Sequence, residues 1–166
     1  MLISARPGMI LTKKDKLSPE EITESVSAIE NECFSVPWTK RSIKSQILTE
    51  GSVFLLVRAD DGKAAGYICG QCVADECELY RIAVLPDYRR LGAADMLMSE
   101  FIAQCEKNGI NSIFLEVRRD NEPAKRLYEK HGFTAVGLRK NYYTAPICDA
   151  IIFRRAGCAG GISAFG

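Results

Sequence analysis

The sequence predicts an α/β (α+β) fold in which a central, mixed and mostly antiparallel sheet is flanked by about four helices. Three observations lead to this class. The chain has 166 residues, which is a usual length for one domain. Two segments with helical periodicity are followed by three segments with strand periodicity, and helices and strands then alternate. A meander of strands followed by helix-linked strands gives a mixed sheet rather than a doubly wound parallel one.

Local signals place the individual elements along the chain. We expect, in order, a strand within 2–12, helices over 19–33 and 39–48, strands over 52–58, 64–73 and 77–85, a helix that ends near 107, a strand over 112–117, a helix over 121–130, and strands over 133–138 and 150–154. The domain is expected to span residues 1–156, and the glycine-rich residues 157–166 are expected to form a flexible C-terminal tail.

Capping residues mark the helix starts. Ser18 can cap the first helix, Pro19 suits its first position, and Glu21 can complete a capping box. Thr39 is expected to cap the second helix, and Asn121 the last one. These residues predict the starts of three of the four helices.

Turn residues separate the remaining elements. Asp60–Lys63 contains a hairpin signal, and a second turn is expected near Asp75–Glu76. Pro86–Asp87 ends the third strand of the meander. Asn108–Gly109 closes the third helix, and Gly132 stops the fourth.

Composition and charge exclude several classes of protein. Lys and Arg number 22 and Asp and Glu number 21, so the chain lacks the basic excess of a nucleic-acid-binding protein. No apolar run reaches the roughly 18 residues needed to span a bilayer, and the N-terminus lacks the pattern of a secretory signal peptide. Seven cysteines without such a signal are typical of reduced thiols. We therefore expect a cytoplasmic protein with no direct nucleic-acid partner and no membrane contact.

The stretch Arg89–Asp95 lies between an expected strand and an expected helix. A helix N-terminus presents unpaired amides and a positive dipole, so it can bind phosphate. Gly92, Ala93 and Ala94 would let a ligand approach the backbone, and two arginines would add positive charge. The stretch lacks the Lys and Ser/Thr of a P-loop and the spaced glycines of a dinucleotide-binding fold. On these residues alone, an ordinary loop with solvated arginines is an equally good interpretation.

A longer pattern around this stretch matches a known family. Arg89-x-x-Gly92-x-Ala94, preceded by Ile82–Val84 on a strand, resembles the acetyl-CoA signature of the GNAT superfamily of N-acetyltransferases, Gln/Arg-x-x-Gly-x-Gly/Ala. The resemblance runs over nearly the whole chain and implies the acyl-CoA N-acyltransferase fold of that family. Three stretches are similar to its RimI-type branch, whose members acetylate the N-terminal amine of a ribosomal protein: Phe34–Trp38, Leu115–Arg118 with Asn121, and Lys140–Tyr143.

The resemblance implies acetyl-CoA as co-substrate and a set of residues that bind it. Loop amides from Arg90 to Asp95 would bind the pyrophosphate, and the backbone of Ile82–Val84 would pair with the pantetheine arm like an added strand. Asn121 would contact that arm, although its alternative role is a simple helix cap. The full set is Ile82, Ala83, Val84, Arg89, Arg90, Leu91, Gly92, Ala93, Ala94, Asp95 and Asn121. Asp95 departs from the family pattern, where a basic residue is common, and could weaken contact with the phosphates.

Acetyl transfer to an amine needs a base and an acid. An alkylammonium must lose a proton before it can attack, and a departing thiolate leaves more easily when an acid protonates it. Glu116 lies in the apolar segment Ile113–Val117, where a carboxylate is costly unless it is paired or faces a wet cleft. The resemblance implies that Glu116 is the general base and Tyr128 the general acid. In the structural alternative, Glu116 is a strand-end glutamate bridged to an arginine such as Arg118, and Tyr128 is a core tyrosine.

Two aromatic residues are candidates for the acceptor site. Trp38 and Tyr142 are expected to form walls of a groove for an extended peptide N-terminus, although buried aromatic residues more often belong to a core. His131, at the end of a helix, is expected to have a structural role.

The cysteines are not expected to bind a metal. Cys69 and Cys72 are three residues apart on an expected strand, so they point to opposite faces, which argues against joint ligation. A zinc site would also need a second ligand pair, which Cys77 alone does not supply.

The resemblance therefore implies an acetyl-CoA-dependent N-acetyltransferase that transfers the acetyl group directly to a protein N-terminal α-amine, expected to be the N-terminal alanine of a ribosomal protein. An α-amine has a pKa of about 8 and a lysine about 10.4, so an α-amine needs less help from Glu116 to become nucleophilic. Two alternatives stay open. The same fold could act on a small amine or a lysine side chain, or the protein could be a non-catalytic acetyl-CoA-binding module.

Overall fold

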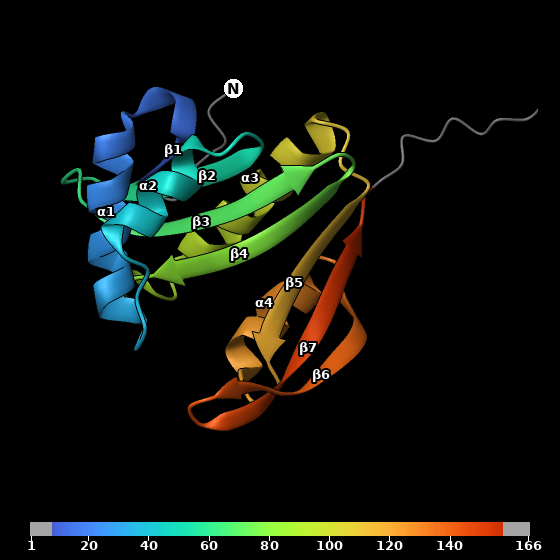
Figure 1. Cartoon of the computed structure of the whole chain (residues 1–166). Coiled ribbons are helices and arrows are strands. Elements are labelled where there is room, and N and C mark those ends of the chain that lie inside the picture. The colour runs from blue at the N-terminus through green and yellow to red at the C-terminus, as the bar shows by residue number, and fades with distance from the viewer. Residues whose placement is uncertain (1–7, 158–166) are drawn as a thin grey trace, which may run out of the picture. The chain divides into compact units, whose positions relative to one another are not determined.

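The computed structural model describes residues 8–157 of the chain (Figure 1). Within this range it has seven strands, four α-helices and two short 3-10 helices. Their order is β1 (Met9–Lys13), η1 (Lys14–Lys16), α1 (Pro19–Cys33), α2 (Lys40–Leu48), β2 (Ser52–Ala59), β3 (Ala64–Val73), β4 (Glu76–Val84), η2 (Pro86–Tyr88), α3 (Ala93–Lys107), β5 (Ser112–Arg118), α4 (Glu122–Lys130), β6 (Thr134–Thr144) and β7 (Ile147–Ala156). The predicted order of helices and strands is confirmed.

The strands follow the order β1-β2-β3-β4-β5-β7-β6 in the sheet. The ladders β1–β2, β2–β3, β5–β7 and β6–β7 are antiparallel, whereas β4 and β5 run parallel. The predicted class, a mixed and mostly antiparallel sheet with four helices, is therefore confirmed.

The described chain forms two compact units. The first consists of residues 8–71 and 80–101, and the second of residues 72–79 and 102–157. The single domain over residues 1–156 stays a prediction, and residues 158–166 of the expected tail lie outside the described residues.

In the first unit, α1 begins as its sequence predicts. The Ser18 hydroxyl accepts a hydrogen bond from the Glu21 amide at 3.2 Å, and the Glu21 carboxylate accepts one from the Ser18 amide at 2.8 Å. This capping box satisfies amides that the first turn of a helix leaves unpaired. One side of the helix is apolar, and Val26 and Ile29 on that side are completely buried. The helix is thus fixed both at its start and along its length.

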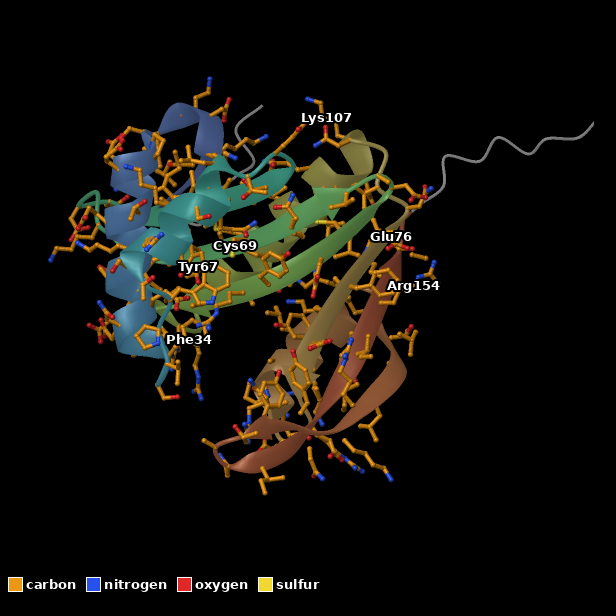
Figure 2. All side chains as sticks on the ribbon, in the orientation of Figure 1. Phe34, Tyr67, Cys69, Glu76, Lys107 and Arg154 are labelled. Atoms are coloured by element: carbon orange, nitrogen blue, oxygen red, sulfur yellow. The ribbon has the colours of Figure 1, made fainter. Side chains whose placement is uncertain are left out.

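The core of this unit lies between the two N-terminal helices and the meander. It joins apolar residues of α1 and α2 to side chains of β2 and β3, among them Phe54, Tyr67 and Cys69. Figure 2 shows Tyr67 and Cys69 along β3, with Phe34 at the end of α1. Cys69 is fully buried here as an apolar side chain.

The second unit is built on β5, β7 and β6, with β7 in the middle. The register places Glu116 of β5 opposite Ile152 of β7, which in turn lies opposite Gly137 of β6. Helix α4 packs through Tyr128, whose ring contacts Phe133 and Phe153 at centroid distances of 5.9 and 6.2 Å. The side chains of Glu116 on β5 and of the paired positions on β6 therefore lie on the same face of the sheet, with β7 between them.

Strand β6 is longer than predicted. The sequence predicts a strand over 133–138, but β6 continues to Thr144. Pairing with β7 extends it, and the ladder is irregular between Arg139 and Tyr143, where Asn141 has a φ of 51°. Most side chains of β6 are exposed, so no alternation of polar and apolar residues marks the extension.

Smaller differences concern β1 and β4. β1 begins at Met9, and the part of the predicted first strand before Gly8 lies outside the described residues. β4 begins at Glu76, because a two-residue turn at Ala74–Asp75 follows β3 and Ala74 adopts a φ of 53°. Within residues 8–157, no helix is both long and apolar enough to cross a bilayer.

Candidate active site

The predicted phosphate loop joins η2 to α3. Arg90 and Gly92 both have positive φ, 62° and 85°, whereas the residues next to them do not. Alternation of this kind is typical of a backbone nest, in which successive amides point into one concavity and attract an anion. Helix α3 begins at Ala93, directly after the loop, and the N-terminus of a helix attracts an anion. The loop thus has the backbone conformation that an anion cradle needs.

The two arginines of the loop differ. The Arg89 guanidinium donates to the Val84 carbonyl at 2.9 Å, so it ties the loop to the end of β4. Arg90 is exposed, and its charge is accessible. Asp95 lies in the first turn of α3, where a carboxylate interacts favourably with the helix dipole. Asp95 therefore has a helix-stabilising position, although it adds negative charge close to the loop.

The strand before the loop has an edge without a partner strand. The parallel ladder between β4 and β5 ends at the Glu78–Phe114 pair. In the described part of the chain, no strand pairs with Ile82–Val84 on that edge of β4. Ile82 and Val84 are partly exposed and Ala83 is buried, and an unpaired strand edge is a place where an extended ligand can add by main-chain hydrogen bonds.

Glu116 of β5 lies in a cluster of charged and aromatic residues in the second unit. Its carboxylate pairs with Arg139 of β6, with 2.8 Å between Oε1 and Nε, and its side chain is 20% exposed. A hydrogen bond to the same carboxylate raises the pKa of the Tyr142 hydroxyl. Two of the predicted site residues are therefore in contact, because Tyr142 is hydrogen-bonded to Glu116.

The structural alternative for Glu116 named Arg118 as an example of an arginine partner, but the arginine that pairs with Glu116 is Arg139. Arg118 pairs instead with Asp120 at 3.1 Å and lies over the Tyr143 ring at 4.9 Å. Arg139 reaches Glu116 because both side chains lie on the same face of the sheet, on either side of β7. Arg139 was not predicted as a site residue, since only the strand order brings it near.

Tyr128 and Asn121 lie on α4. Tyr128 is 7% exposed, and burial raises the pKa of its hydroxyl, with a smaller contribution from Tyr143. Burial and the nearby Glu116 also raise the pKa of Tyr143. Tyr143 therefore lies close enough to both Glu116 and Tyr128 to interact with each of them. The Asn121 side chain accepts a hydrogen bond from the Ala124 amide at 3.2 Å, which confirms the predicted helix cap.

In the first unit, Trp38 is held in place by a buried glutamate. Glu30 of α1 is completely buried, and its carboxylate accepts a hydrogen bond from the Trp38 amide at 2.7 Å. The Arg81 guanidinium lies 2.9 Å from the same carboxylate, and the Tyr67 hydroxyl donates to it. Three donors from three segments therefore satisfy one buried charge.

The aromatic residues near Trp38 complete this arrangement. The Arg81 guanidinium lies over the rings of Phe34 and Trp38, 4.2 and 4.9 Å from their centroids. Trp38 also meets Tyr80 edge-on at 6.3 Å. Glu30 and Arg81 were not predicted. A signal existed for Glu30, because it lies four residues after the buried Val26, on the apolar side of α1.

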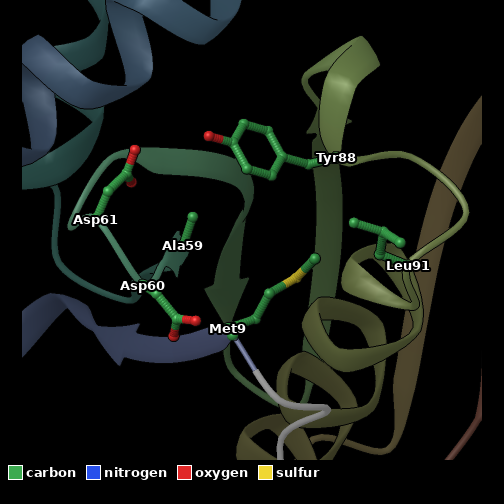
Figure 3. Close-up of a pocket in the computed structure, with 7 residues that line it drawn as sticks. Met9, Ala59, Asp60, Asp61, Tyr88 and Leu91 are labelled. Carbon is green, nitrogen blue, oxygen red and sulfur yellow. The ribbon is translucent and has the colours of Figure 1, made fainter.

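A pocket of about 600 Å³ lies near the loop (Figure 3). It is lined by Gly8, Met9, Ala59, Asp60, Asp61, Tyr88 and Leu91. Only Leu91 belongs to the predicted site, and two carboxylates in the lining do not suit a phosphate group. The pocket is therefore separate from the predicted chemistry.

The comparisons with known proteins agree with this geometry. A model of the acetyltransferase (GNAT) family matches residues 23–133. The chain belongs to the acetyltransferase (GNAT) family. Enzymes of this family are acyltransferases that generally use acetyl-CoA, and the matched residues include Trp38, the phosphate loop, Glu116 and Tyr128.

Several GNAT relatives have been named by their substrate. The ribosomal protein bS18-alanine N-acetyltransferases of Haemophilus influenzae and Escherichia coli are each 36% identical to this chain, over 124 and 130 residues. These alignments cover 74% of this chain and 82% of the first relative, and 76% of this chain and 86% of the second.

Solved GNAT structures share the fold. The ribosomal-protein-S18-alanine N-acetyltransferase from Escherichia coli has a TM-score of 0.84 at 31% identity and covers 95% of this chain and 99% of its own. Ard1 from Thermoplasma volcanium has a TM-score of 0.77 at 28% identity and covers 89% of this chain and 97% of its own.

The Glu30 cluster gives a first prediction. Glu30→Gln replaces the buried carboxylate with a neutral amide, which leaves the Arg81 guanidinium without its counter-charge and turns one acceptor position into a donor, so we expect the free energy of unfolding to fall by about 3 kcal/mol. Glu24→Gln on the same helix is the matched control, because the Glu24–Lys40 pair is exposed and contributes below about 1 kcal/mol. Urea denaturation measures the free energy of unfolding of both variants. An equal decrease in the two would show that the buried Glu30 carboxylate contributes no more than an exposed one.

Alkaline pH should destabilise the protein through its buried tyrosines. Burial raises the pKa of Tyr67 and Tyr128. Above a pH of about 10, the unfolded chain loses these phenolic protons while the folded chain keeps them, so each tyrosine lowers the free energy of unfolding by about 1.4 kcal/mol per pH unit. Below a pH of about 10, both tyrosines are protonated in the folded and the unfolded chain, so this pH-dependent loss in the free energy of unfolding is absent. Denaturation of the wild type and Tyr128→Phe between about pH 9 and 11 should give a shallower slope for the variant, and identical slopes would contradict the assignment.

Proposed function

We propose that this GNAT protein uses acetyl-CoA to acetylate the N-terminal alanine of ribosomal protein bS18. The observation that carries the proposal is the 36% identity to enzymes of that name over about three quarters of the chain. The substrate is a ribosomal protein, so the reaction would take place in the cytoplasm, at a protein N-terminus and without contact to nucleic acid or membrane.

Acetyl-CoA supplies the acetyl group as a thioester. Positive φ values at Arg90 and Gly92 support a role of the 90–95 amides as the cradle for its pyrophosphate. The open edge of β4 supports main-chain pairing of Ile82–Val84 with the amides of the pantetheine arm. Asn121 would contact that arm while it caps α4.

Glu116 is the proposed general base. It accepts the proton that the α-ammonium of the acceptor must lose, directly or through one water. Arg139 and Tyr142 both donate to its carboxylate, so its orientation is fixed before an acceptor binds. The partial exposure of Glu116 gives a proton a path to solvent.

Tyr128 is the proposed general acid. Its raised pKa keeps the phenol protonated at neutral pH, as a proton donor to the departing thiolate must be. The protons then balance. The α-ammonium loses one proton to Glu116, the free amine bonds to the thioester carbonyl carbon, and the carbon–sulfur bond breaks as Tyr128 protonates the sulfur. The second proton that nitrogen loses as the amide forms returns the Tyr128 phenolate to the phenol, and Glu116 releases its proton to solvent.

Trp38 and Tyr142 are the proposed walls of the acceptor site. Tyr142 is 49% exposed although it donates to Glu116, so its ring is available to a peptide. Trp38 is fixed by its amide bond to Glu30 and its contact with Arg81, which gives a rigid aromatic surface. Rigid aromatic contacts bind extended peptides at low entropic cost.

Substitution of the base and the acid tests the mechanism. Glu116→Gln and Tyr128→Phe should each lower kcat by about 100-fold or more, the usual contribution of general acid–base catalysis, with the KM for acetyl-CoA little changed. The assay follows CoA release and the mass of a peptide that carries the N-terminal sequence of bS18.

Controls separate the mechanism from the acceptor. Glu24→Gln should keep the wild-type rate, since this exposed residue has no part in the site. Wild-type rates in both Glu116→Gln and Tyr128→Phe would remove these residues from the mechanism. Acetylation of lysine side chains or polyamines in preference to the α-amine would refute the acceptor, and acetyl-CoA binding without CoA release to any amine would indicate a binding module.

The phosphate loop gives a separate prediction. Gly92→Ala places a side chain at a φ of 85°, which strains the backbone by about 1–2 kcal/mol and should raise the KM for acetyl-CoA about tenfold. Gly62→Ala is the matched control, because Gly62 has a φ of 81° with no atom within 4 Å of an added Cβ. Both variants lose similar stability, but only Gly92→Ala should change the KM. An unchanged KM would exclude the loop as the cradle.

A further inference from the structure

Three cysteines of the second unit converge at one place. Cys72 is on β3, Cys77 on β4 and Cys105 in the last turns of α3, and their sulfur atoms all lie within 4.8 Å of one another. The Cys72 and Cys77 sulfurs are 3.0 Å apart, and Cys72 is also hydrogen-bonded to Cys105. Cys69 is not part of this group, as its opposite orientation on the strand predicts.

The topology explains why these residues meet. Ala74–Asp75 is a two-residue turn, so residues 72 and 77 lie opposite each other on the hairpin and point to the same face. The turn is tied to the segment after α3, because the Asn111 amide donates to the Asp75 carbonyl at 2.6 Å and its side chain to the Asp75 carboxylate at 2.9 Å. The hairpin that carries Cys72 and Cys77 is thus held to the segment that follows α3, the helix that carries Cys105.

The chemistry of the group suits a thiophilic cation. Thiolates are the ligands that Zn²⁺ and similar soft ions prefer. Zinc–sulfur bonds of about 2.3 Å in a tetrahedral site hold sulfurs roughly 3.8 Å apart, which lies within the range of separations here. Cys77 and Cys105 are 1% exposed, whereas Cys72 is half-buried. An ion could therefore enter beside Cys72 and keep one solvent ligand there.

We propose that Cys72, Cys77 and Cys105 form a binding site for a thiophilic divalent ion of the Zn²⁺ class, which clamps the β3–β4 hairpin to the C-terminal end of α3. The site takes no part in acetyl transfer and is independent of the proposed function. Bound metal stabilises the folded state by mass action, since the unfolded chain does not hold the three thiolates together.

Cobalt binding to the full chain tests the site. In a phosphine reductant, the protein should bind one equivalent of Co²⁺ with thiolate-to-cobalt charge-transfer absorption and tetrahedral d–d bands, and Zn²⁺ should displace it. Cys72→Ser and Cys105→Ala should each weaken Co²⁺ binding by at least about 100-fold, because even outer-shell partners of metal ligands contribute 10- to 100-fold. Zn²⁺ should also raise the Tm of the wild type but not of Cys72→Ser.

Matched variants make the result specific. Cys148→Ser is the control for Cys72→Ser, since Cys148 is equally intermediate in exposure and belongs to the same unit. Cys69→Ala is the control for Cys105→Ala, because both side chains are buried. Circular dichroism checks the fold of each variant, and Cys72→Ser keeps the test valid if Cys105→Ala does not fold.

Three outcomes would overturn the proposal. The first is a cobalt complex without thiolate bands, and the second is equal affinity in Cys72→Ser and Cys148→Ser. The third is a Cys72–Cys77 disulfide, found by mass spectrometry, that forms in air as fast with Zn²⁺ as without it. That result would assign the sulfurs to a redox pair instead.

Discussion

The buried carboxylate of Glu30 is the interaction on which the first unit depends. An anion without solvent is stable only if donors surround it, and here the donors come from the loop after α1, from β3 and from β4. These segments can therefore adopt only arrangements in which all three donors converge. Trp38 and the C-terminal half of β4, which carry proposed substrate contacts, have their positions set by this charge.

The second unit places the proposed base and acid in unlike surroundings. Glu116 is partly exposed, and a guanidinium and a phenol bind its side chain. Tyr128 lies among Phe133 and Phe153, which favour a neutral hydroxyl. The two proposed proton-transfer groups thus lie on adjoining elements, one in a polar environment and one in an apolar environment.

Local signals predicted much of the fold, because capping boxes and hairpin turns depend on a few neighbouring residues. Contacts that depend on strand order could not be predicted. Arg139 meets Glu116 only because β7 lies between β5 and β6, and Cys105 meets Cys72 only where α3 ends beside the hairpin. Residues 139–144 of β6 were not predicted as strand, because an exposed strand shows no alternation of polar and apolar residues.

The short ladder between β4 and β5 also has a consequence for solubility. A strand edge without a partner strand can pair with an extended backbone, including that of another protein molecule. Tyr80 on the same strand is 38% exposed and offers an apolar contact to a second protein molecule. If acetyl-CoA pairs with Ile82–Val84 as proposed, the bound co-substrate covers this edge and thereby also reduces aggregation.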